Sequence, residues 1–193
     1  MKKLLAIVIL SLCFIVPSKA DDIRDFQVEG ITVGESLLNF LNEDEILQNI
    51  RDYGYKDDTY FVTNVTKKKY LKTYDVIEIY LKKNDKNYTV MSVDASVYYE
   101  DKKKCLSQMD SIQDNFSDIV KTKVRNNKKK YIHYADTSNK SIYYRTDWDV
   151  NNLGFIAIEC VFWSQKIKDK HNWDDHLRIS ITKKDLNDWL LTQ

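Results

Sequence analysis

The chain has 193 residues, 43% of them hydrophobic, so it is long enough to bury a core of its own. Lysines and arginines number 30 and acidic residues 29, which gives a formal net charge of +1. This near balance argues against a general polyanion binder, and we expect no nucleic-acid partner. The sequence also lacks a Gly-rich phosphate loop and the G-x-S-x-G motif of many hydrolases.

The first twenty residues have the three parts of a secretory signal. Two lysines precede an apolar run over 4–16, and Ser18 and Ala20 stand where a signal peptidase reads small side chains. The run of about 13 residues is shorter than the roughly 20 needed to span a bilayer. We therefore predict a signal peptide at 1–20 and a single α+β domain at 21–193, with no transmembrane segment after cleavage.

Two other interpretations of this start remain open. One is an uncleaved N-terminal anchor, and the other is a lipoprotein that uses Cys13, although bulky Leu12 precedes that cysteine. Cleavage after Ala20 fits the pattern better, removes three lysines and no acid, and leaves a net charge of −2. The predicted location is periplasmic or secreted.

Signal cleavage leaves two cysteines, Cys105 and Cys160. In an oxidising compartment an isolated pair usually forms a disulfide, which we predict here. Two buried free thiols are the alternative. Neither cysteine belongs to a C-x-x-C motif, so a catalytic thiol is not expected.

The N-terminal part of the domain begins with two helix signals. Thr32 and Glu35 have the spacing of a capping box, which predicts a helix at 33–41. Asn42 repeats this pattern and predicts a second helix at 43–51.

Strands and one long helix follow. Runs rich in β-branched and aromatic residues, with alternating polarity, predict strands at 59–65, 74–81 and 90–99. Apolar residues at three- and four-residue steps predict a helix over 101–124, with Cys105 on its inner face.

The remaining chain predicts more strands. We interpret 125–130 as a polar connection, and expect strands at 131–135, 141–148, 154–163 and 177–182. In the last strand Arg178 and Ser180 face outward, and a terminal helix follows Thr182. The order predicts an α+β fold, with an antiparallel sheet of about six or seven strands and helices packed mainly on one face. Cys160 then faces the same helix–sheet interface as Cys105.

Three segments carry a resemblance: the opening "DIRDFQVEGITVGESLLNFLNEDEI", the cysteine-bearing helix, and the ending "LRISITKKDLNDWL". Together they resemble an uncharacterised family of small exported proteins from AT-rich bacteria. The resemblance implies export and a bacterial source, and it implies no activity or catalytic residue.

The segment "HNWDDH" is the candidate for metal chemistry. Its possible ligands are His171, Asp174, Asp175 and His176. A five-residue separation of the histidines does not suit a helical ligand pair, and a solvated polar loop is the other interpretation. The stretch 147–154 begins like a calcium loop but lacks the required glycine and glutamate, so we interpret it as a turn.

Aromatic residues are the one unusual feature of the composition. Tyr143, Trp148 and Trp173 lie on or beside predicted strands, where a shared exposed face would form a stacking platform for a ligand or partner. The leading hypothesis is an exported, non-catalytic protein that binds a partner or ligand in the envelope without a cofactor. A metal-dependent or other hydrolase that uses 171–176 is the alternative, and an envelope-assembly factor is a third possibility.

Overall fold

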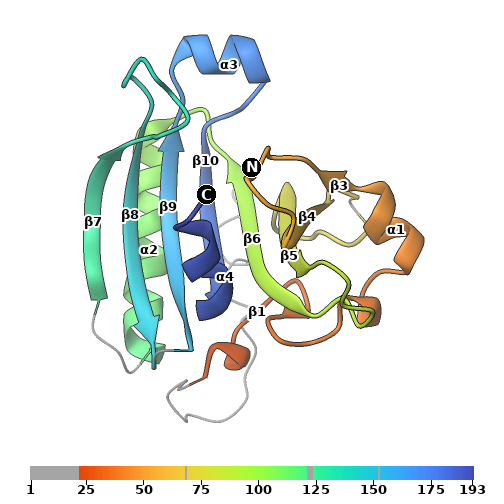
Figure 1. The fold of residues 1–193 in the computed structure, drawn as a ribbon. Helices are drawn as coiled ribbons and strands as arrows, with labels where there is room; N and C mark the ends of the chain where they lie inside the picture. The colour runs from red at the N-terminus through yellow and green to blue at the C-terminus, as the bar shows by residue number, and fades with distance from the viewer. Residues whose placement is uncertain (1–21, 68, 121–123, 152) are drawn as a thin grey trace.

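A computed structural model describes residues 22–67, 69–120, 124–151 and 153–193 of the chain. Its centre is an eight-stranded sheet in the order β3-β4-β5-β6-β10-β9-β8-β7 (Figure 1). Every neighbouring pair in this sheet is antiparallel. The predicted signal peptide lies outside the described residues.

The strands of the main sheet, in chain order, are β3 (Ile50–Arg51), β4 (Tyr60–Val65), β5 (Val76–Lys82), β6 (Val90–Tyr98), β7 (Val124–Ile132), β8 (Ile142–Val150), β9 (Gly154–Phe162) and β10 (His176–Lys183). A two-stranded ribbon consists of β1 (Gln27–Val28) and β2 (Ile31–Thr32). The helices are α1 (Glu43–Gln48), α2 (Lys102–Ile119), α3 (Gln165–His171), α4 (Lys184–Leu190) and the short 3-10 turns η1 (Ile23–Asp25) and η2 (Leu37–Asn39).

Helix α2 covers one face of the sheet, behind β8 and β9 in Figure 1. It begins at Asp101, whose side chain accepts hydrogen bonds from the backbone N–H groups of Lys103 and Lys104. Met109 and Phe116 are buried from its inner side. Cys105 forms a disulfide with Cys160 of β9, as predicted, with their Cα atoms 6.1 Å apart.

The N-terminal segment packs on the same face as α2. Ile23, Phe26 and Leu37 are buried in the same core cluster as Met109, and the ring of Phe26 stacks on that of Phe116 at 5.8 Å. This face of the sheet is therefore closed by the N-terminal segment together with one long helix.

The opposite face carries α4, which contacts β9 and β10. Leu186 of α4 is fully buried in a second, smaller cluster with Val62 and Tyr80. Helices therefore lie on both faces. The α+β class is confirmed, and the sheet has eight strands where six or seven were expected.

The predicted helix at 33–41 is wrong. Gly34 has a φ of +92°, and its N–H donates to the carbonyl of Val90 at 2.8 Å, so the chain is tied to β6 instead of turning into a helix. Only η2 forms, capped by Ser36. The capping box at Asn42 is confirmed, because its side chain accepts from the Glu45 N–H and the Glu45 side chain accepts from the Asn42 N–H.

The polar connection expected at 125–130 is also wrong, because these residues belong to β7. This strand lies at the edge of the sheet and pairs only with β8. An edge strand can be polar on both faces, and lysines and bulges are common there because they discourage pairing with another chain. Helix α3 was not predicted, and the expected loop before β10 remains for 172–175.

Among the described residues no helix is long and apolar enough to cross a bilayer.

Candidate functional site

The strand alternation places a row of charged and polar side chains on the sheet face opposite α2. Arg145 of β8 is directly opposite Glu159 of β9, Glu159 is opposite Arg178 of β10, and Arg178 is opposite Ser96 of β6. The same alternation aims the neighbouring isoleucines and cysteine at the core. Along this row the sheet thus has one apolar and one polar face, while the smaller apolar cluster under α4 lies elsewhere on the second face.

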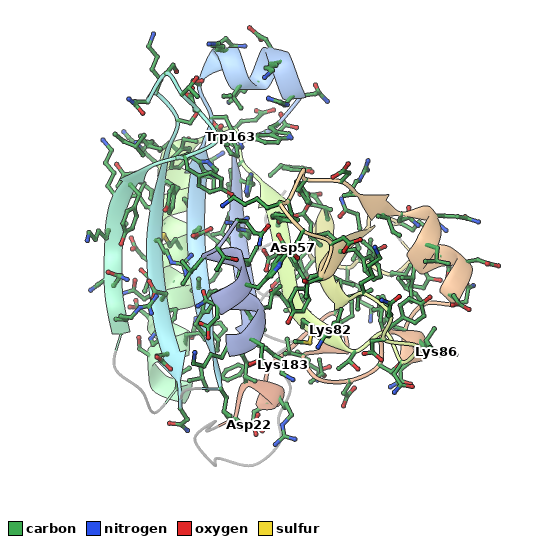
Figure 2. The ribbon with its side chains drawn as sticks, in the orientation of Figure 1. Asp22, Asp57, Lys82, Lys86, Trp163 and Lys183 are labelled. Atoms are coloured by element: carbon green, nitrogen blue, oxygen red, sulfur yellow. A yellow bond between two sulfur atoms is a disulfide. The ribbon has the colours of Figure 1, made fainter. Side chains whose placement is uncertain are left out.

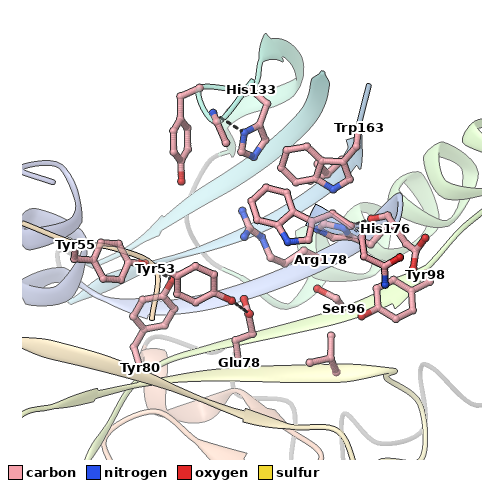
Figure 3. A pocket seen from close by; sticks show the side chains of 17 residues that line it. Tyr53, Tyr55, Glu78, Tyr80, Ser96, Tyr98, His133, Trp163, His176 and Arg178 are labelled. Atoms are coloured by element: carbon pink, nitrogen blue, oxygen red, sulfur yellow. Dashed lines mark hydrogen bonds between the residues drawn. The ribbon is translucent and has the colours of Figure 1, made fainter. Parts of the chain in front are cut away.

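A cavity of about 230 Å³ opens on this polar face, between the β3–β4 loop, the β7–β8 turn and the α3–β10 loop. Seven tyrosine and tryptophan side chains dominate its lining: Tyr53, Tyr55, Tyr80, Tyr98, Tyr134, Trp163 and Trp173. In Figure 3 the first three tyrosines gather at one side, and Trp163, His176 and Arg178 at the other, with Glu78 between them. Segments that are far apart in the sequence therefore build a single site.

Arg178, which lines the cavity, belongs to a row of ion pairs on the same face of the sheet. Arg178 donates through Nε to Oε2 of Glu159 at 3.0 Å, and Arg145 donates through Nη1 to Oε1 of the same carboxylate at 2.6 Å. Arg145 also reaches Asp147 at 3.2 Å, which Arg125 pairs from the other side at 2.7 Å. Charges of both signs alternate along this row, so the ion pairs hold these side chains in place without a ligand.

Glu159 is the centre of these pairs and is only 2% exposed. Burial alone would raise the pKa of its carboxyl, but Arg178 and Arg145 together lower that pKa to about 2. The carboxylate is therefore charged at every physiological pH, and both arginines stay fixed beside it.

The tyrosine side of the cavity includes one further carboxylate. The hydroxyl of Tyr53 donates to Glu78, and the hydroxyls of Tyr55 and Tyr80 are 3.0 Å apart. Burial raises the pKa of Glu78, which has no ion pair among the described residues. Its second oxygen is thus a hydrogen-bond acceptor available to a ligand.

Two histidines line the opposite side as neutral rings. Burial lowers the pKa of His133 and of His176 to about 4 in each case. Nδ1 of His133 accepts the backbone N–H of Ala135 at 3.2 Å, so its proton resides on Nε2. Nδ1 of His176 lies 2.9 Å from the Asp174 carbonyl, which can only accept, so here the proton is on Nδ1.

Short-range hydrogen bonds fix the loops that carry these rings. Asp136 accepts from the hydroxyls of Ser138 and Ser141, which lowers the pKa of its carboxyl and closes the β7–β8 turn beneath His133. Asp175 accepts the backbone N–H of Trp163 at 2.8 Å and pairs with Lys168 of α3.

The loop that carries Tyr53 and Tyr55 is held in place by the C-terminal end of the described chain. The N–H of Lys56 donates to the side-chain oxygen of Gln193 at 2.8 Å, and Nε1 of Trp189 donates to Asp57 at 2.8 Å. The rings of Tyr55 and Trp189 are 4.9 Å apart. The end of α4 therefore supports the wall formed by Tyr53 and Tyr55.

The structure separates the four predicted metal ligands. Asp174 and His176 line the cavity, Asp175 forms the structural contacts described above, and exposed His171 stacks on Trp173 at 4.7 Å. No group of three or more metal-ligating side chains converges among the described residues.

The three predicted aromatic residues also lie apart. Trp173 lines the cavity, and Tyr143 is beside it, 5.5 Å from the His133 ring. Trp148 is 0% exposed and stacks on Phe116 beneath α2, so its placement on a solvent-facing platform is wrong. Its position in β8 has the opposite parity from Tyr143, which sends the two rings to opposite faces.

Sequence reasoning missed most of the site. Tyr53, Tyr55 and Glu78 carried no motif, and the partner of outward-facing Arg178 depends on a register that no local pattern specifies. The available signal was the alternation of side chains in two predicted strands. Tyr143, Arg145 and Asp147 share one face of β8, and Glu159 and Val161 share one face of β9, so charged residues that can pair lie on the outward face of both strands.

Comparisons with known proteins add no relative: no family model, curated protein or solved structure matches the chain.

Proposed function

We propose that this protein is an exported, non-catalytic protein that binds a small ligand in the aromatic cavity. The observation that carries the proposal is the cavity itself, in which seven tyrosine and tryptophan rings surround a few fixed polar groups. Small-molecule sites typically combine a mostly apolar lining with a small number of placed polar groups.

The polar groups of the site are already held in fixed positions, which supports the binding proposal. Arg178, Glu159 and Arg145 are held by one another, and the Asp136 turn holds His133. A site whose groups are already fixed loses little conformational entropy when a ligand enters. This arrangement suits recognition of one shape.

The proposed export rests on the N-terminal signal pattern and on the disulfide. Disulfides persist in oxidising compartments and are rare in the cytosol. Mass spectrometry of the native product should find a chain that begins at Asp21, with both cysteines resistant to alkylation until a reductant is added. A product that begins at Met1 with reactive thiols would contradict export.

The binding proposal is tested by filling the cavity. Ala135 lines it from a turn, so Ala135→Trp places a large ring in the cavity without altering a strand. Thr137→Trp is the matched control, since Thr137 is exposed on the same turn. In a thermal-shift screen of metabolites, ligands should stabilise the native chain and Thr137→Trp but not Ala135→Trp.

Equal stabilisation of Ala135→Trp would place the binding site elsewhere and contradict the proposal. The alternative hydrolase keeps one supporting feature, the shared position of Asp174 and His176 at the cavity. NMR spectra of each hit after long incubation distinguish the two. Turnover that His176→Asn abolishes, or stoichiometric zinc in the purified protein, would replace the binding proposal with the hydrolase.

A further inference from the structure

We infer that the ligand of this cavity is a neutral polyhydroxy compound, a sugar ring that is free or part of a glycan. The inference rests on the proposed binding function and names the chemical class of its ligand. It follows from three properties of the lining: the mixture of unused donors and acceptors, the opposed charges, and the aromatic faces.

The unused hydrogen-bonding groups are of both kinds. The indole N–H of Trp163 is buried and has no hydrogen-bond partner among the described residues. His133 offers a second donor at Nε2, because its Nδ1 accepts from Ala135. His176 offers an acceptor at Nε2, because its Nδ1 donates to the Asp174 carbonyl.

Glu78 and Arg178 extend this mixture. One oxygen of Glu78 accepts from Tyr53, which leaves the other for a ligand. Arg178 uses Nε and Nη2 on Glu159, while its Nη1 is 3.9 Å from Asp94, beyond hydrogen-bond distance. A hydroxyl group can donate and accept at once, so a ring that bears several hydroxyls can serve donors and acceptors together.

The charges argue against an ionic ligand. The charged groups of the lining are the carboxylates of Glu78 and exposed Asp174 and the guanidinium of Arg178. A cation that approached Glu78 would also meet Arg178, whose side chain is 30% exposed on the same cavity. An anion that approached Arg178 would meet Glu78, Glu159 and Asp94. Because like charges in a partly desolvated site repel strongly, a neutral ligand is favoured over either ion.

The aromatic rings supply the apolar contact that a sugar needs. A ring face carries negative charge density, and the polarised C–H groups on one face of a pyranose pack against it. Trp163 and Trp173 are adjacent here, with ring centres 4.7 Å apart. At about 230 Å³ the cavity is smaller than the roughly 300–1,000 Å³ of drug-sized sites, which fits one ring.

Tyr134 extends the aromatic surface out of the cavity. It belongs to the lining, is 90% exposed, and stacks on His133 at 4.8 Å. A second sugar joined to the one in the cavity would meet this ring. Because Tyr134 is so exposed, Tyr134→Ala tests this contact without disturbing the fold.

The experiment measures binding of uncharged sugars against their charged counterparts. Saturation-transfer NMR and tryptophan fluorescence titration of the disulfide-bonded protein would use glucose, galactose, mannose and N-acetylglucosamine, together with cationic glucosamine, anionic glucuronate and choline. A glycan array would extend the panel to oligosaccharides. At least one neutral sugar should bind at least tenfold more tightly than its charged counterparts.

Variants test the assigned contacts. Trp163→Phe removes the unpaired indole N–H and keeps a ring, and it should weaken the bound sugar about tenfold. Trp148→Phe is the control, since Trp148 also has a buried indole N–H without a hydrogen-bond partner among the described residues, but it lies under α2 on the other face of the sheet and does not line the cavity. Glu78→Gln should weaken the same sugar while exposed Glu100→Gln has no effect. Tyr134→Ala should weaken an oligosaccharide more than its terminal monosaccharide.

Each failure has its own meaning. Tighter binding of glucosamine, choline or glucuronate than of any neutral sugar, blocked by Ala135→Trp, would overturn the sugar inference and leave the binding function standing. Sugar binding that Trp163→Phe and Glu78→Gln leave unchanged would overturn the assigned contacts and the inference with them. No binding by any probe or array glycan would also overturn the inference, and a metabolite screen without hits would then remove the binding function.

Discussion

At the scale of single residues, Glu159 is the centre of the ion pairs on the polar face. It is opposite Arg145 on one side and opposite Arg178 on the other, so one carboxylate balances two guanidinium groups. A buried charge whose partner is removed keeps its desolvation cost without the compensating attraction. Loss of this acid would therefore leave two partly buried arginines without their shared partner.

Replacement of Glu159 by glutamine should therefore destabilise the protein strongly. We expect Glu159→Gln to lower the free energy of unfolding by about 3 kcal/mol, because both arginines lose their shared charge partner. Urea denaturation followed by fluorescence measures this loss. Glu100→Gln, on the exposed surface, should change the free energy of unfolding by less than about 0.5 kcal/mol. Similar values for both variants would show that the ion pairs contribute little.

At the scale of elements, sequence patterns predicted what depends on local periodicity. The spacing of Cys105, Met109 and Phe116 predicted helix α2 with Cys105 on its inner side. The pairing with Cys160 was predicted from the two cysteines left after signal cleavage and from the inward-facing position of Cys160 in its strand, and it is confirmed. The patterns failed at 33–41, where long-range hydrogen bonds to β6 override a local cap, and at β7, where an edge strand needs no apolar face. Most residues of the site could not be predicted from local sequence patterns, because the strand register brings them together.

The disulfide is the covalent link between two elements, α2 and β9. Removing it in Cys105→Ala/Cys160→Ala frees a loop of 55 residues in the unfolded chain and should lower the free energy of unfolding by about 4 kcal/mol. Urea denaturation of the native chain and the double variant measures the difference. Dithiothreitol should destabilise the native chain and leave the double variant unchanged. A loss below about 1 kcal/mol would mean that the link adds little beyond the packing around it.

Strand β7 carries a prediction about association. Its lysines at the open edge, including Lys129 and Lys130, and the irregular register beside them should prevent a second chain from adding to the sheet. Lys129→Thr/Lys130→Val should therefore promote concentration-dependent association, visible by light scattering. The matched control Lys102→Thr/Lys103→Val alters exposed lysines on α2 and should remain unassociated. Equal behaviour of the two variants would remove β7 as the protected edge.

At the scale of the whole molecule, the sheet separates two tasks. The face under α2 holds the larger apolar core and the disulfide, and the other face holds the cavity and the row of ion pairs. In Figure 2, Trp163 of the cavity lies below α3, and Asp57 lies beside α4. Substitutions in the cavity lining can therefore change the shape of the cavity while the main core stays intact. The two neutral histidines on this face make the free energy of unfolding depend on pH.

The free energy of unfolding should fall as the pH drops from about 6.5 toward 4. Both histidines have a pKa of about 4 in the folded chain, whereas an unfolded histidine titrates near 6.5. In this window the unfolded chain binds more protons, so lower pH favours unfolding, by at most about 1 kcal/mol per pH unit for His176. Denaturation curves at several pH values should show a flatter dependence for His176→Gln. An unchanged slope would contradict the neutral buried ring.

The contacts between Gln193 and the Lys56 backbone have a practical consequence. Through this hydrogen bond Gln193 helps to hold the loop that carries Tyr53 and Tyr55. A purification tag or fluorescent fusion joined after Gln193 would disturb this contact. Weak ligand binding by such a fusion would therefore reflect the tag and not the protein. Surface immobilisation through a lysine of α2, on the far side of the sheet, would leave the cavity mouth open to solution.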